Sequence, residues 1–157
     1  MLEKKLRRHL AQLKDPKLVL YYKSGKRDYS EAANAIATSL GRFTEATLCF
    51  SFCISGDGWG IDPQPDERWV RYRQWRGAQG ENRRLFDAPG HLFGSHEAEQ
   101  LSRTLVFAFE LGWDALLGVK PGRQLLSLSH HDRLDVYRGF GGRSLADKLI
   151  PLGYWRR

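Results

Sequence analysis

Residues 46–54 read ATLCFSFCI, and this stretch decides the fold class. Large apolar residues alternate with small or polar ones along it, and a period of two is the spacing of a strand that buries one face. The predicted buried face carries Leu48, Phe50, Phe52 and Ile54. We therefore predict a strand at residues 46–54.

The same strand holds the two cysteines of the chain, Cys49 and Cys53. Both thiols fall on its other face, but four residues of extended chain separate them by about 13 Å, which is too far for a disulfide. A zinc site would need two further ligands, and the sequence has no second cysteine pair. We predict reduced, core-packed thiols, no metal and no cofactor.

Glycine and proline follow this strand, so we predict a flexible loop at residues 55–66. Residues 69–75 (WVRYRQW) alternate again and predict a second strand. A second flexible loop is predicted at residues 77–82, which would allow a hairpin with a partner strand near Arg83 to Asp87.

The C-terminal half mixes helical and extended patterns. Ser95 is placed to cap a helix that ends at Leu111, just before Gly112. Ser129 and Asp132 have the spacing of a capping box and predict another helix through Tyr137. The other predicted elements are strands at 113–119 and 124–128, a turn at 120–123 between them, and a helical stretch at 144–150.

Leucines at helical spacing predict an amphipathic N-terminal helix over residues 1–15. Docking on the rest of the domain is the simplest role for its narrow apolar stripe, and contact with RNA or a membrane surface is the alternative. A strand at 17–22 and a helix at 28–40 follow it. The basic outer face of the first helix is formed by Lys4, Lys5, Arg7 and Arg8.

The order of these elements, with two strand pairs joined by short turns, predicts an α+β fold. We expect a single domain over residues 1–157, with a largely antiparallel sheet covered by about four helices, because 157 residues is the length of one domain. No apolar run is long enough to cross a bilayer and none follows Met1, so we expect a cytoplasmic protein.

The positive charge of the chain is clustered. Twenty-five basic and eighteen acidic side chains give a net charge of +7. A net charge of +4 is carried by residues 1–14 and another +4 by residues 67–84, which leaves a net charge of −1 for the rest of the chain. Such clusters attract nucleic acid, anionic lipid or an acidic protein surface.

One face of the predicted strand at 69–75 combines both tryptophans with two arginines, and solvent-facing positions seldom hold two tryptophans. Tryptophan and arginine dominate the energetics of protein interfaces, and aromatics among arginines also stack bases. The alternative is that these side chains cover a helix. The candidate partner-binding residues are Trp69, Arg71, Arg73 and Trp75, with Trp59 and Arg76 nearby.

His130, His131 and Asp132 form the densest ionisable cluster of the sequence. Histidine titrates near neutral pH, so these residues are the candidates for acid–base catalysis if His91 or His96 folds back to join them. The same residues are also explained as the start of a helix.

No pattern is specific enough to name an activity. A short chain without a catalytic signature but with clustered charge and aromatics is typical of bacterial immunity proteins and small inhibitors. We therefore expect a non-enzymatic protein-binding module, an immunity or antitoxin-like inhibitor that docks an acidic partner through its Trp/Arg face. The alternatives are a nucleic-acid-binding protein that uses the two basic clusters, and a small hydrolase that uses His130, His131 and Asp132.

Overall fold

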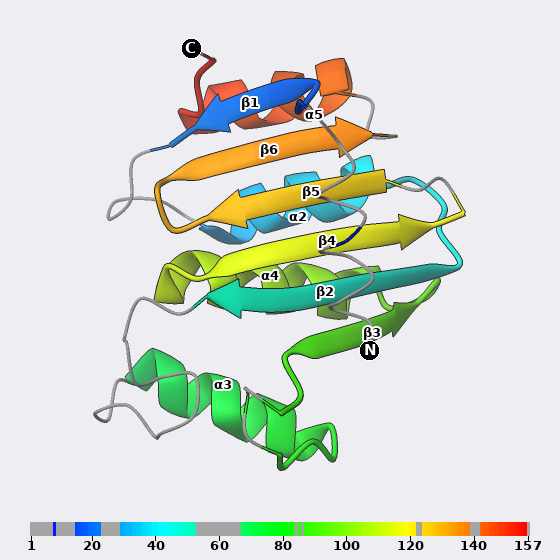
Figure 1. The fold of residues 1–157 in the computed structure, drawn as a ribbon, viewed down its shortest axis with the longest axis vertical. Helices are drawn as coiled ribbons and strands as arrows, with labels where there is room; N and C mark the ends of the chain where they lie inside the picture. Colours follow the sequence, from blue (N-terminus) through cyan, green and yellow to red (C-terminus); the bar gives the residue numbers. More distant parts are fainter. Residues whose placement is uncertain are drawn as a thin grey trace.

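A six-stranded sheet forms one layer of the structure, and each pair of neighbouring strands is antiparallel (Figure 1). The computed structural model describes residues 8, 15–22, 29–52, 67–83, 85, 87–121, 124–138 and 142–156. In spatial order the strands are β1 (Leu18–Tyr21), β6 (Arg133–Arg138), β5 (Gln124–Ser129), β4 (Asp114–Lys120), β2 (Glu45–Phe52) and β3 (Gly90–Gly94).

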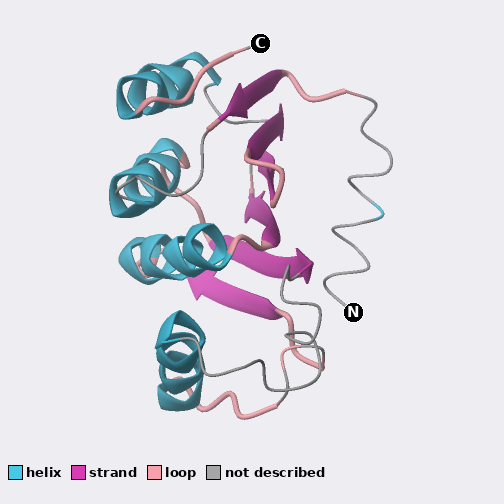
Figure 2. Cartoon of the chain, turned by 90° about the vertical axis from the view of Figure 1, so that its left-hand side faces the viewer, coloured by secondary structure: helices cyan, strands magenta, loops and turns pink. Residues whose placement is uncertain are grey.

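The second layer consists of helices, and all four described α-helices lie on the same face of the sheet (Figure 2). Helix α2 packs between α4 and α5, and α3 lies beyond α4, below the edge strand β3 in Figure 1. This arrangement confirms the predicted α+β class with an antiparallel sheet and four helices. The helices are α2 (Tyr29–Ser39), α3 (Glu67–Ala78), α4 (Ala98–Leu111) and α5 (Gly142–Leu149), followed by the 3-10 turn η1 (Ile150–Leu152).

The core lies between the two layers and includes one face of β2. The β2–β4 register places Leu48 opposite Leu117 and Phe50 opposite Ala115. All four side chains are buried under the helices. The alternation in residues 46–54 predicts this for Leu48 and Phe50, and the described part of that stretch ends at Phe52. Cys49 is buried on the other face and forms no disulfide, and Cys53 lies outside the described residues.

Two predicted elements have the wrong secondary structure. The predicted strand from Trp69 to Trp75 is the helix α3, because its buried residues recur at three- and four-residue intervals. The predicted helix through Tyr137 is the strand β6, because its backbone pairs with β1 on one side and β5 on the other, and Ser129 belongs to β5 instead of capping a helix.

Three smaller predictions also need correction. Helix α4 begins after Glu97 and not after Ser95, while its predicted end is confirmed by Gly112, whose left-handed conformation places backbone hydrogen bonds on the last carbonyls. Strand β3 was not predicted, and none of the described residues between Arg83 and Asp87 is in a strand. Of the predicted loops, 55–66 lies outside the described residues, and 77–82 begins inside α3.

We predict that Phe50→Ala lowers the free energy of unfolding by about 3–5 kcal/mol, because it removes a fully buried aromatic ring from the centre of the core. Val70→Ala on the exposed side of α3 is the control, and it should cost less than about 0.5 kcal/mol. Urea unfolding measures both. Similar losses for the two variants would contradict this description of the core.

Candidate interaction surface on helix α3

Helix α3 is attached to the domain by one stripe of side chains. Trp69, Tyr72 and Arg76 are buried and recur at i, i+3 and i+7, which is one face of an α-helix. Trp75 is partly buried beside them and packs on the cluster of core residues. The stripe is unusual because one of its four members is an arginine.

Aromatic rings make most of the contacts of this stripe. Tyr72 meets Phe50 and Trp113 edge to face, with ring centroids 5.6 and 5.2 Å apart. It also meets Phe107 of α4 at 5.2 Å, and Trp69 meets Trp113 at 5.4 Å. Edge-to-face pairs stabilise by about 0.5–1.5 kcal/mol beyond the area they bury, so α3 is held firmly against β2 and α4.

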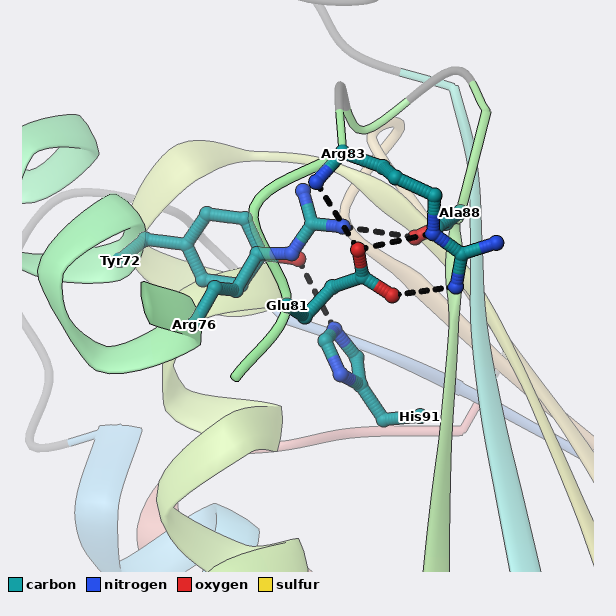
Figure 3. Close-up of polar contacts among 6 residues, drawn as sticks. All are labelled: Tyr72, Arg76, Glu81, Arg83, Ala88 and His91. Atoms are coloured by element: carbon teal, nitrogen blue, oxygen red, sulfur yellow. Dashed lines mark hydrogen bonds and ion pairs between the residues drawn. The ribbon is translucent and has the colours of Figure 1, made fainter. Parts of the chain in front are cut away.

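Two polar groups complete the attachment (Figure 3). The Tyr72 hydroxyl and the Nε2 of His91, on β3, share a hydrogen bond of 2.9 Å. Arg76 donates from Nη2 to the carbonyl oxygen of Ala88 at 2.9 Å, and its guanidinium lies 5.7 Å from the centre of the Tyr72 ring. Arg76 therefore connects α3 to the segment that enters β3 and gains a cation–π contact as well.

Burial lowers the pKa of His91 from its ordinary 6.5 to about 4. The positive charge of Arg76 acts in the same direction, and the negative charge of Glu81 opposes it. His91 is therefore neutral in the folded protein at pH 7, and it shares the hydrogen bond with Tyr72 in that form.

A local ion pair follows the end of α3. Glu81 accepts hydrogen bonds from the backbone N–H and the Nε of Arg83, both at 2.9 Å. The side-chain hydrogen bond from Arg83 is the main cause that lowers the pKa of Glu81 to about 2. Because this pair is exposed to solvent, it orders the turn locally and stabilises the fold little.

The opposite side of α3 faces solvent, and we call it the α3 outer face. Arg71 donates to the carboxylate of Glu110 at 2.7 Å with its side chain still 51% exposed, and Arg68 donates to the carbonyl oxygen of Glu110 at 2.6 Å. Val70, which lies between Arg71 and Arg73 around the helix, is 40% exposed. The outer face is formed by Arg68, Val70, Arg71, Arg73 and Gln74.

The structure divides the predicted Trp/Arg face between the interior and the surface. Trp69 and Arg76 are buried and Trp75 is partly buried, so these three hold α3 in place. Arg71 and Arg73 are exposed and remain candidates for binding a partner. Trp59 lies outside the described residues, as do Lys4, Lys5 and Arg7 of the predicted basic helix, whereas Arg8 is helical and exposed.

The histidines do not come together. His130 and His131 lie in the turn between β5 and β6, and the strands β4 and β2 separate that turn from His91 and His96 around β3. His130 pairs through Nδ1 with the carboxylate of Asp114 at 2.8 Å, a partner that the sequence analysis missed.

The predicted capping box around these histidines is a tight turn. The backbone N–H of His130 donates to the same Asp114 oxygen at 2.6 Å, and the N–H of His131 donates to Ser129 Oγ at 3.3 Å. Asp132 adopts a left-handed φ of 57°, which closes the turn. Within the described part of the chain, no group of three or more His, Cys, Asp or Glu is arranged to hold a metal ion.

Comparison with protein-family models, curated proteins and solved structures finds no match to this chain. Among the described helices, none combines the length and the apolar character that crossing a membrane requires.

We predict that His91 makes the stability of the fold depend on pH. Between pH 6.5 and about 4 the unfolded chain takes up a proton at this residue and the folded chain does not, so stability is complete above pH 6.5 and falls as the pH is lowered. The loss attributable to His91 is up to about 3 kcal/mol across this window.

The measurement is urea unfolding of the wild type and of His91→Gln at several pH values from 7 to 4. The variant should be less stable at pH 7 but should lose less stability on acidification. His131→Gln, at an exposed histidine, is the control and should keep the wild-type dependence. If the free energy of unfolding depends on pH with the same slope in the wild type and in His91→Gln, His91 does not cause the pH dependence.

Proposed function

We propose that this protein is a non-enzymatic binding module that docks an acidic partner protein through the α3 outer face. The class of function that suits it best is an immunity or antitoxin-like inhibitor, whose arginines pair with carboxylates of the partner and block it without chemistry.

The observation that carries this proposal is the pairing of two exposed arginines, one on either side of Val70 around the helix, with a rigid support. Arg73 projects from a helix whose other side is fixed by Trp69, Tyr72 and Arg76. Arg71 is also exposed, but it is already paired with Glu110, so binding a partner through Arg71 exchanges one carboxylate for another. A rigidly held helix has little backbone freedom left to lose when it binds, and a guanidinium matches a carboxylate through two parallel hydrogen bonds. The α3 outer face therefore offers preorganised anchors.

The exposed valine favours a protein over a nucleic acid as the partner. Val70 lies among the arginines and is 40% exposed. An apolar side chain gains nothing against phosphates, whereas a protein interface has an apolar centre surrounded by polar groups. Helix α3 has 12 residues and is about 18 Å long, so it can supply part of a standard interface, which buries about 800 Å² on each partner.

We predict that Arg73→Glu weakens complex formation by about 30-fold or more, because reversing an anchor charge costs about 2 kcal/mol at least. Arg42→Glu makes the same charge change at an exposed position beyond the end of α2 and should bind as the wild type does. The partner is captured with the wild-type chain from a nuclease-treated lysate of the source organism, and its affinity for each variant is measured by titration.

Both variants should melt within a few degrees of the wild type, since neither side chain is buried. Equal binding of the partner by Arg73→Glu and wild type would refute the proposed surface. Recovery of nucleic acid in place of a protein, with binding that falls steeply as salt rises, would favour the nucleic-acid alternative.

A further inference from the structure

The face of the sheet opposite the helices has a buried centre. Cys49 on β2, Leu116 on β4 and Leu125 on β5 alternate with the core residues of their strands, so they point to this side. They are only 1, 3 and 1% exposed. All the described helices lie on the other side, as Figure 2 shows.

The register joins these side chains into one apolar strip across the strands. Cys49 is directly opposite Leu116, and Gly118 is opposite both Thr47 and Leu125. The half-exposed Leu92 extends the strip onto β3 through its pairing with Thr47. Two ion pairs border the strip toward the strand ends: Glu45 with Lys120, and Asp114 with His130. Toward β1 the row of Cys49 and Leu116 continues through Ser127 to the buried Asp135, which pairs with Arg133.

We propose that residues 2–14 cover this strip as an amphipathic helix whose leucines face Leu116 and Leu125. The segment carries one apolar stripe and otherwise mostly basic or polar residues, which is the pattern of a helix lying on an apolar surface. Arg8, the one described residue within it, is helical and exposed, as a residue on the outer side must be. The stripe consists of Leu2, Leu6, Leu10 and Leu13.

The length and starting point of the segment fit the strip. Lys17 donates its backbone N–H to Val136 of β6 at 2.8 Å, so the segment leaves the sheet at the β1 edge. Thirteen helical residues span about 20 Å. Four strand spacings, from β1 across to β2, span about 19 Å. The helix can therefore cross the buried centre of the face without an intervening loop.

Three other occupants fit less well. A second copy of the chain or a membrane is not needed to bury side chains that are already covered in a single chain. Residues 53–66 also lie outside the description, but their glycines, prolines and acidic residues provide no continuous apolar stripe. Of the two segments, only residues 2–14 repeat leucine at helical spacing.

The placement has a consequence for the two basic clusters. Residues 1–14 would present Lys4, Lys5 and Arg8 outside the sheet layer, whereas α3 belongs to the helix layer on the other side (Figure 2). The clusters then cannot form one continuous positive surface. This inference is independent of the proposed binding function, since it concerns the other face of the sheet.

The test that leaves the chain unchanged is NMR of the full protein with labelled leucine methyl groups. We expect nuclear Overhauser contacts from Leu116 and Leu125 to Leu6 and Leu10, at a concentration where gel filtration shows a single species. Contacts from these two leucines to residues 53–66, to a second chain, or to neither segment would overturn the proposal.

The second test uses Cys49 as a reporter in a Cys53→Ser background. The double variant Leu6→Asp/Leu10→Asp should increase the rate of Cys49 alkylation about tenfold or more, because it removes the cover from the buried thiol. Lys4→Asp/Arg8→Asp changes the opposite side of the same segment and should stay within about twofold of the parent. Equal rates for the two double variants would overturn the proposal, and if the leucine variant does not fold, the NMR contacts decide.

Discussion

The contact of Phe50 with Tyr72 and Trp113 is the interaction on which the rest of the molecule depends. Helix α3 lies at the end of the helix layer, where it has one helical neighbour, α4, and the edge strand β3. Packing against α4 alone would leave it poorly fixed. The ring of Phe50, on the strand next to the edge strand β3, reaches Tyr72 and Trp113 together and brings α3 into the main core.

The position of α3 explains both of its faces. Because it ends the layer, its inner face needs more contacts than a central helix would, and aromatic rings, His91 and Arg76 provide them. For the same reason its outer face has no neighbour beyond α4 among the described residues, and its arginines are exposed. The proposed binding surface therefore follows from the end position of α3 together with its strong attachment.

The sequence was sufficient to predict the fold class because residues 46–54 and the hairpin of β4 and β5 have unambiguous patterns. It was insufficient for residues 69–75, where Trp69 and Trp75 alternate with Arg71 and Arg73 and therefore fit a strand. The helix also fits, but only if Arg76 is counted among the buried residues, and arginine is rarely buried.

The error at the C-terminal side has a similar origin. Ser129 and Asp132 satisfy the spacing of a helix cap, yet the same polar residues close a tight turn. The apolar residues Leu134 and Val136 are two positions apart, and this spacing was the signal that predicts the strand β6. For the candidate site, the sequence predicted the arginines but not their support, because Tyr72, His91 and Phe50 are far apart in the chain and meet only in the folded sheet.

The central claim is that the attachment of α3 to the core creates a binding surface on its other side. Hydrogen–deuterium exchange of the full chain, alone and in complex with its captured partner, tests this claim most directly. The account predicts that the partner slows amide exchange most strongly within residues 67–83, which include α3 and the turn after it. Slowed exchange confined to the β5–β6 turn or to the β1 edge, with α3 unchanged, would contradict it.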